Sequence, residues 1–261
     1  MPRPVAPALP LHHWTVLSLR PRGQHGGLRA AARRLGARLL AASPIAIAAL
    51  DDAAARTALA TALAADRVLF TSPNAVRAAM RLAPLRPRRG QAWLAVGDGT
   101  RRALARAGIA AIAPARMDSE GLLALPALAD VRGLRVGLVT APGGRGVLAP
   151  SLMARGARVL RADVYQRQAV ALPARQRAAL ENALLAPEHV LLVASSGEAL
   201  AALLSQADAT ALRRCAVVAA SPRLAAAARA AGFTRIATAS DPRPAPLLQA
   251  AAAAFAAPDL V

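Results

Sequence analysis

Short runs rich in Ser, Thr and Gly, where an apolar stretch gives way to a helix-forming one, are the residues of this chain best suited to chemistry. Five such runs occur, at 71–74, 97–100, 140–145, 195–198 and 220–223. A helix N-terminus presents free N–H groups and a partial positive charge, so each run could hold part of an anionic ligand. The same residue types also simply begin helices, and that alternative stays open for each run taken alone.

Dedicated catalytic motifs are absent from the sequence. "GDGTRRA" at 97–103 lacks the third glycine of a dinucleotide fingerprint, and "APGGRG" at 141–146 lacks the lysine of a P-loop. The four histidines, at 12, 13, 25 and 189, have no spacing that builds a metal site. Cys215 opens the apolar run "CAVVAA", which is typical of buried packing rather than of a nucleophile.

The charge of the chain points to an anionic partner. Every basic residue is arginine, and 33 basic residues face 14 acidic ones, for a net charge of +19. A GC-rich genome would explain arginine in place of lysine, but not the excess of positive charge. A field of this sign attracts nucleic acid, anionic lipid or a polycarboxylate. Arginine also binds carboxylates through two parallel hydrogen bonds.

Several features favour a cytoplasmic protein without a membrane partner. Cys215 is the only cysteine, so there is no disulfide framework and a reducing compartment is expected. The opening "MPRPVAPALPLHH" has no apolar core of the kind a signal peptide needs. The longest uncharged tract, 245–258, is too short to span a bilayer. A composition of 56% apolar but only 2% aromatic residues is typical of helices that cover a parallel sheet with Leu, Val and Ala.

The chain contains an internal repeat. "VLFTSPNAVRAAM" at 68–80 returns as "LVASSGEALAALL" at 192–204, a displacement of 124 residues that sets Ser196 on Ser72 and also Gly232 on Gly108. Upstream, 14–40 matches 134–160 at a shift of 120 residues. We therefore interpret the chain as two related halves, about 14–125 and 134–250.

Each half reads as alternating strands and helices, which predicts parallel sheets with helices on both faces. The expected strands are 14–20, 37–42, 67–71, 92–96 and 110–113, and then 134–140, 157–162, 190–194, 215–219 and 235–238. Two extended segments, 43–50 and 163–170, are predicted to be linkers. The shift of 120 residues sets Ile45 on Tyr165 within them.

Six segments together resemble the uroporphyrinogen-III synthases over nearly the whole chain after residue 13. They are "RPRG" after the first strand, "PIAIAALDD" (44–52), "FTSPNAV" (70–76), "VGDGTRRAL" (96–104), "GARVLRADVYQRQ" (156–168) and "ASSGEAL" (194–200). The resemblance implies an α/β fold of two related doubly wound parallel-sheet domains, flavodoxin-like or Rossmann-like. One domain would comprise 1–42 and 171–261, the other 51–163, with linker strands 43–50 and 163–170 and a ligand cleft between the domains.

The resemblance also implies a reaction. Hydroxymethylbilane, a linear tetrapyrrole polycarboxylate, would lose water, invert its terminal ring through a spiro intermediate and close to uroporphyrinogen III. The electron-rich pyrroles expel the hydroxyl themselves, so no cofactor is expected and catalysis is mainly positioning. A monomer is expected, with hand-over of substrate from the preceding bilane-forming enzyme.

The family's pattern assigns roles to individual residues. Tyr165, in "VYQ", would be the catalytic proton donor to the departing hydroxyl. Thr100 and Gly97 belong to the Gly-x-x-Thr turn, and in its second copy Ser221 and Leu224 replace glycine and threonine, which puts that turn's contacts in doubt. The expected substrate-binding residues are Arg20, Thr71, Ser72, Asn74, Gly97, Thr100, Arg145, Ser195, Ser196 and Ser221.

Two other classes of protein stay open at this point. A basic nucleic-acid-binding protein would use aromatic stacking platforms, but the chain has only six Phe, Trp and Tyr residues, scattered singly, so no nucleic-acid partner is expected. A non-catalytic receptor for an anionic metabolite would have the same two domains and the same cleft. Sequence does not separate that receptor from the enzyme.

Overall fold

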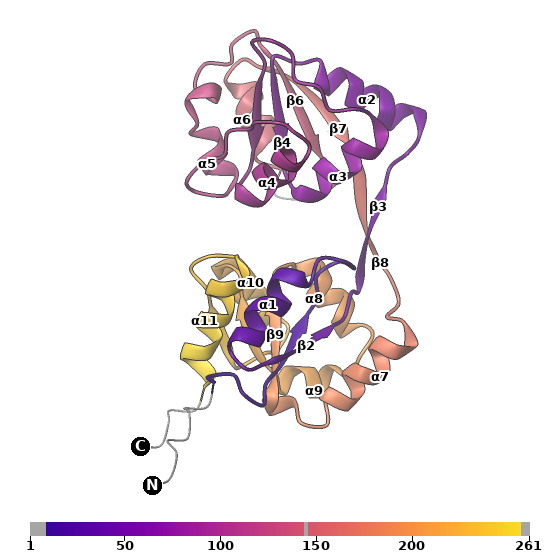
Figure 1. Ribbon diagram of the computed structural model, residues 1–261, viewed down its shortest axis with the longest axis vertical. Helices are drawn as coiled ribbons and strands as arrows, with labels where there is room; N and C mark the ends of the chain where they lie inside the picture. Colours follow the sequence, from indigo (N-terminus) through magenta and orange to yellow (C-terminus); the bar gives the residue numbers. More distant parts are fainter. Residues whose placement is uncertain (1–8, 144–145, 257–261) are drawn as a thin grey trace. The chain divides into compact units, whose positions relative to one another are not determined.

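The computed structural model describes residues 9–143 and 146–256, which form two compact units (Figure 1). Unit 1 is built from the chain up to Ala46 and from Gln168 onward, and unit 2 is Ile47–Arg167. Across the described residues, no helix combines the length and apolar character that crossing a bilayer requires.

Unit 1 contains a five-stranded parallel sheet in the order β11-β10-β9-β1-β2. Its strands are β1 (Thr15–Ser18), β2 (Arg38–Ala41), β9 (Val190–Ala194), β10 (Ala216–Ala219) and β11 (Ile236–Thr238). Successive strand residues point to opposite faces, so Val16 and Leu17 belong to two different cores. Helices α1 (Gly26–Arg34) and α11 (Pro244–Phe255) cover the Val16 face, whereas the Leu17 face packs against α7 (Ala174–Ala183), α8 (Gly197–Leu204), α9 (Ala209–Arg214) and α10 (Pro222–Ala230). The short 3-10 helix η2 (Pro187–His189) precedes β9.

Unit 2 contains a four-stranded parallel sheet in the order β5-β4-β6-β7. Its strands are β4 (Arg67–Phe70), β5 (Ala92–Ala95), β6 (Arg135–Thr140) and β7 (Arg158–Asp163). Helices α2 (Ala53–Leu63), α3 (Pro73–Leu82) and α4 (Asp98–Arg106) bury one face, and α5 (Ser119–Leu123), η1 (Pro126–Leu128) and α6 (Leu148–Ala154) bury the other. Gly137 lets α2 lie directly on β6, because a Cβ there would lie 2.0 Å from the carbonyl oxygen of Ala62.

The structure contradicts the strand that was predicted at 110–113. Ile112 makes only an isolated parallel bridge to Leu94, through its N–H to Trp93 O (2.9 Å) and its carbonyl to Ala95 N–H (2.8 Å). Ile112 is half exposed, and Pro114 follows without an N–H to extend the ladder. The pairing therefore stops after one residue.

The two sheets share one topology. Read from the edge, unit 1 runs β2-β1-β9-β10-β11 and unit 2 runs β7-β6-β4-β5 with Ile112 beyond β5. Unit 1 follows the flavodoxin-like order 2-1-3-4-5, and unit 2 follows the same order when each of its strands takes the number of its equivalent in unit 1. The switch points therefore lie between β1 and β9 and between β6 and β4. These strand equivalences are the ones that the displacements of 120 and 124 residues predict. The predicted fold class, two related parallel α/β domains, is confirmed.

Two strands connect the units. β3 (Ile45–Ala49) and β8 (Tyr165–Ala169) form a two-stranded sheet (Figure 1). The N–H of Leu50 donates to Val164 O at 3.1 Å, and the N–H of Val170 donates to Pro44 O at 2.9 Å, so the strands run in opposite directions. The first residue of each strand, Ile45 or Tyr165, is buried in the core of a unit. The domain boundaries expected from the sequence, at residues 42, 51, 163 and 171, stay a prediction.

Candidate functional site

A cavity of about 270 Å³ opens at the carboxyl end of the unit 2 sheet. Hydroxyl groups from the strand ends line it together with two arginines and the start of α5. The lining includes Thr71, Ser72, Met117, Asp118, Ser119, Thr140, Arg161, Tyr165 and Arg167. Three of the residues singled out from the sequence, Thr71, Ser72 and Tyr165, therefore meet in one place.

Thr71 and Thr140 form the polar end of the switch point in unit 2. Thr140 is the last residue of β6 and Thr71 follows β4, and the hydroxyl of Thr71 donates to Thr140 Oγ1 at 2.8 Å. Since the strands are neighbours, the pair lies where a doubly wound sheet collects its ligand.

Tyr165 is held by both its ring and its hydroxyl. The residue is only 3% exposed, and its ring belongs to the apolar core of unit 2 with Val139 and Val164. Its hydroxyl lies 3.1 Å from Ser72 Oγ, which is the N-cap of α3 and accepts the N–H of Ala75 at 3.0 Å. The phenol hydroxyl therefore has a defined position beside the positive end of a helix.

Two arginines flank Tyr165 and hold the loop that follows β6. Arg161 forms a forked ion pair with Asp163, with Nη2 at 3.0 Å and Nε at 3.1 Å from the carboxylate, and donates to Ala141 O at 3.1 Å. Arg167 Nη2 donates to Pro142 O at 3.3 Å. Both arginines line the cavity, where Asp163 offsets the charge of Arg161.

Sequence reasoning did not name Arg161 or Arg167, and it included Thr140 only as the first residue of the run 140–145. Arg167 lies two positions after Tyr165 on one strand, and the period of two puts them on the same side. Thr140 falls on Arg20 at the shift of 120 residues, so the repeat already contained this signal. Nothing in the sequence pattern singles out Arg161.

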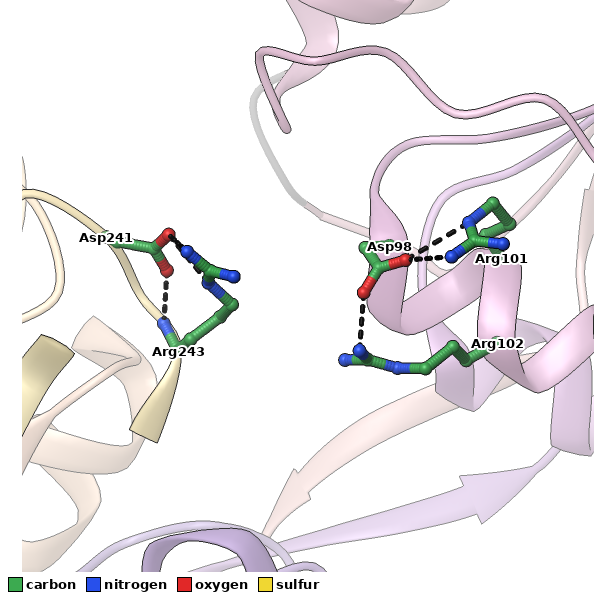
Figure 2. Close-up of polar contacts among 5 residues, drawn as sticks. All are labelled: Asp98, Arg101, Arg102, Asp241 and Arg243. Atoms are coloured by element: carbon green, nitrogen blue, oxygen red, sulfur yellow. Dashed lines mark hydrogen bonds and ion pairs between the residues drawn. The ribbon is translucent and has the colours of Figure 1, made fainter. Parts of the chain in front are cut away.

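The Gly-x-x-Thr turn mainly builds the start of α4. Gly97 is buried, and a Cβ there would lie 3.0 Å from the Cβ of Met117, so the packing favours glycine. Thr100 is 2% exposed. Figure 2 shows Asp98 in ion pairs with Arg101 and Arg102, each at 2.5 Å. Contacts of Gly97 and Thr100 with substrate stay a prediction.

Asn74 is engaged within its own helix, where its Oδ1 accepts from Arg77 Nη2 at 2.6 Å. Arg77 lies one turn further along α3, on the same side of the helix. A contact between Asn74 and substrate stays a prediction.

In unit 1, the two loops equivalent to 71–74 and 97–100 each begin a helix with a serine N-cap. Ser196 Oγ accepts from Ala199 N–H at 3.3 Å at the start of α8, and Ser221 Oγ accepts from Leu224 N–H at 3.4 Å at the start of α10. Leu224 is 4% exposed, so it fills the buried place that Thr100 fills in unit 2. This explains why an apolar residue is accepted at that turn. Ser195 follows β9 and is half-buried.

A second acidic–basic pair lies just before α11 in unit 1. Asp241 accepts the backbone N–H of Arg243 at 2.7 Å and pairs with its guanidinium at 2.6 Å (Figure 2). This hydrogen bonding lowers the pKa of the Asp241 carboxyl. The pair fixes the turn into the helix.

Arg20 follows β1 at the switch point of unit 1. It is half-buried, and burial lowers the pKa of its guanidinium. Its Nε is buried, and among residues 9–143 and 146–256 nothing accepts a hydrogen bond from it. A buried donor left unpaired is costly, so this group is suited to an incoming anion. Arg145, the other arginine that was expected to bind substrate, lies outside the described residues.

Neither a metal centre nor a reactive thiol emerges from the described residues. They contain no group of three or more His, Cys, Asp and Glu side chains that could hold a metal ion. Cys215 is fully buried, and burial raises the pKa of its thiol to about 12. The thiol therefore packs in the unit 1 core, as the sequence pattern suggested.

The fold and the site define a class: a duplicated α/β protein with hydroxyl groups, helix N-termini and arginines at the carboxyl ends of its strands. The family model described as uroporphyrinogen-III synthase HemD matches residues 27–249. The chain belongs to the uroporphyrinogen-III synthase family, lyases of porphyrin biosynthesis.

Solved structures agree with this assignment. A mutant uroporphyrinogen III synthase from Thermus thermophilus is 25% identical, with 92% of this chain and 98% of that chain covered and a TM-score of 0.58. Uroporphyrinogen-III synthetase from Helicobacter pylori has a TM-score of 0.63 over 92% and 98% of the two chains. At 14% identity, that second likeness concerns the fold alone.

Proposed function

We propose that this chain cyclises hydroxymethylbilane to uroporphyrinogen III, with loss of water and inversion of the terminal pyrrole ring. Family membership supports the reaction. The observation that carries the site is the buried Tyr165, whose hydroxyl lies 3.1 Å from Ser72 at a cavity in unit 2. Neither the receptor nor the nucleic-acid binder gains support from the comparisons.

Tyr165 is the proposed proton donor to the departing hydroxyl. Ser72 Oγ accepts a hydrogen bond from Ala75 N–H, so its own O–H can donate a hydrogen bond to the phenol oxygen. The phenol proton then points to the leaving group. As the carbon–oxygen bond breaks, the pyrrole nitrogen supplies the electron pair and the phenol supplies the proton, which releases water. The resulting azafulvenium loses its N–H proton, which restores the phenol and leaves the azafulvene.

The cavity is proposed to hold one end of the substrate. Its volume of about 270 Å³ lies just below the range of pockets that enclose a drug-sized ligand, so it does not take a whole tetrapyrrole. The hydroxyls of Thr71 and Thr140 would bind the terminal ring, and Arg161 and Arg167 its carboxylates. The remaining carboxylates would bind Arg20 and the capped helix starts at Ser196 and Ser221.

The same chemistry favours direct supply of the substrate. Free hydroxymethylbilane closes spontaneously to the uninverted type I isomer, so hand-over from the bilane-forming enzyme would protect the yield of type III. A monomer is the proposed working unit. A cytoplasmic location fits the single, buried Cys215.

The test is to supply hydroxymethylbilane to the purified protein and resolve the isomers after oxidation to porphyrins. We expect type III as the main product, against type I in a protein-free reaction. Type I alone, in the presence of folded protein, would refute the enzymatic function and favour a receptor.

A further inference from the structure

A buried histidine lies at the carboxyl edge of the unit 1 sheet, in a place that the reaction described above does not use. His25 directly precedes α1 and is 8% exposed. Its Nδ1 lies 2.9 Å from the hydroxyl of Ser18 at the end of β1, and its Nε2 lies 3.0 Å from the hydroxyl of Ser43 after β2. Both ring nitrogens are thus engaged by neighbouring strand ends.

The hydrogen bonds around Ser43 fix the direction of the network. Ser43 donates its hydroxyl proton to the carbonyl oxygen of Arg20 at 2.9 Å, so it must accept from His25 Nε2–H. The other nitrogen of a neutral ring then accepts from the hydroxyl of Ser18. Gln176 of α7 accepts the backbone N–H of Ser43 at 3.1 Å and holds that serine in place. One tautomer of neutral His25 therefore satisfies every contact.

Arg20 is the residue that this network restrains. Its carbonyl is held by Ser43, while its Nε is buried without an acceptor among the described residues. An arginine would avoid that arrangement if its backbone could shift, because an unpaired buried donor is costly. The network from His25 through Ser43 opposes such a shift at the switch point between β1 and β9.

We propose that His25 is a positioning residue, which acts through Ser43 to hold Arg20 ready for a carboxylate of the tetrapyrrole. The inference rests on the proposed function for the identity of the ligand. The carboxylate would take the hydrogen bond that Arg20 Nε now lacks. Since a carboxylate remote from the reacting carbon is bound equally in ground and transition states, losing this contact raises KM and leaves kcat nearly unchanged.

The test compares four variants in the hydroxymethylbilane assay. Arg20→Gln is expected to raise KM about tenfold or more, because hydrogen bonds between charged groups are the strong ones. His25→Ala and Ser43→Ala are expected to raise KM about three- to tenfold, with kcat within about twofold. His189→Ala is the matched control. That histidine packs against Trp14 at the opposite, amino edge of the same sheet and should leave KM unchanged.

A double-variant cycle separates positioning from a general structural role. If His25 acts only through Arg20, the variant with both His25→Ala and Arg20→Gln has the KM of Arg20→Gln alone. Additive effects on KM, or a fall in kcat with KM unchanged, would overturn the proposal. If His25→Ala does not fold, Ser43→Ala, which keeps the ring, decides the question.

Two readouts do not depend on turnover. Anaerobic calorimetry with uroporphyrinogen III should show weaker binding to His25→Ala, Ser43→Ala and Arg20→Gln than to the wild-type chain. Weakened binding in a protein that forms only type I would keep this inference while the proposed function fails. Type III formation with unchanged KM and binding in the variants would remove this inference alone.

Nitrogen NMR of the histidine rings at pH 7.5 should find the proton on His25 Nε2, and a proton on Nδ1 would contradict the network.

Discussion

Ile45 of unit 1 and Tyr165 of unit 2 occupy the same position of a duplicated fold. Each is the first residue of a connecting strand, each is nearly fully buried at 6% and 3% exposure, and each packs into the core of a unit. They differ in the side chain, because only Tyr165 has an aromatic ring and a hydroxyl, which contacts Ser72. The duplicated scaffold explains why this position is buried. The chemistry comes from the side chain that only one copy carries.

The two units also differ in the residues at their switch points. In unit 2 the strand ends meet through the hydroxyls of Thr71 and Thr140. In unit 1 the residue equivalent to Thr140 is Arg20, and a buried His25 with two serines lies beside it. One topology thus places a pair of hydroxyl groups at the switch point of unit 2 and an arginine beside a buried histidine at the switch point of unit 1.

Tyr165→Phe is the variant expected to have the largest effect on activity. It keeps the ring and its packing but removes the proton donor, so kcat should fall about ten- to a hundredfold, with type III still the enzymatic product. Stopped assays with isomer separation measure both. The control is Ile45→Val, a small change at the equivalent position, which should cost about 0.5–1.5 kcal/mol of stability and leave kcat unchanged. Full activity in a folded Tyr165→Phe protein would remove the tyrosine from the mechanism.

Two equivalent N-cap serines, Ser72 in unit 2 and Ser196 in unit 1, test the difference between the two units. Ser72→Ala and Ser196→Ala each remove a cap, so each should cost about 0.5–2 kcal/mol of unfolding free energy. Only Ser72 also contacts the Tyr165 hydroxyl, so only its loss should lower kcat, by about three- to tenfold. Denaturant unfolding and steady-state kinetics test the two effects separately. Equal losses of kcat in both variants would mean that Ser72 acts as a cap alone.

The repeat explains how much of the fold the sequence could predict. Glycines, N-caps and strand–turn–helix order recur at shifts of 120 and 124 residues, and these local signals set the strands and their equivalence. The failure at 110–113 has a local cause. Apolar residues there resemble a strand, but whether an edge strand extends depends on partners that sequence does not display, and Pro114 ends the pairing.

The site could be predicted only in part. Thr71, Ser72 and Tyr165 were each expected at the site from the sequence, and the structure brings them together in one cavity. The network of Ser18, His25 and Ser43 could not be found, because its members are unremarkable singly and meet only through side-chain packing across neighbouring strands. A histidine stands out in a sequence when its spacing from other ligand residues suits a metal site, and His25 has no such spacing.

Acid should weaken unit 1 more than unit 2. Burial and the nearby charges of Arg29 and Arg20 lower the pKa of His25 below its ordinary value of 6.5. The stability from neutral His25 is therefore complete above about pH 6.5, where the unfolded chain is also neutral, and is lost as pH falls toward the lowered pKa. His25→Gln should flatten this pH dependence of unit 1.

The chain offers a separate probe for each unit in its two tryptophans, Trp14 in unit 1 and Trp93 in unit 2. In a Trp93→Phe background, thermal unfolding followed by Trp14 fluorescence between pH 7.5 and 5.5 should show the effect of His25→Gln. In a Trp14→Phe background, the Trp93 signal should not. An identical pH response of Trp14 with and without His25 would show that the histidine does not titrate with folding.

The smallest expected effect concerns salt, and it compares the arginines of the two units. Arg167 makes a solvent-exposed contact at the cavity of unit 2, whereas Arg20 Nε is buried in unit 1. Exposed charge pairs contribute about 0.2–1 kcal/mol, so Arg167→Gln should raise KM about two- to threefold at low ionic strength. In 1 M salt, where the Debye length is about 3 Å, that difference should disappear. A buried pair is screened much less, so the larger KM of Arg20→Gln should persist in 1 M salt.

Arg167→Lys, which keeps the charge, is the matched control and should follow the wild-type salt response. If both glutamine variants converge on the wild-type KM in 1 M salt, then Arg20 meets its carboxylate in water, and the contrast between the two sites is one of position rather than of burial.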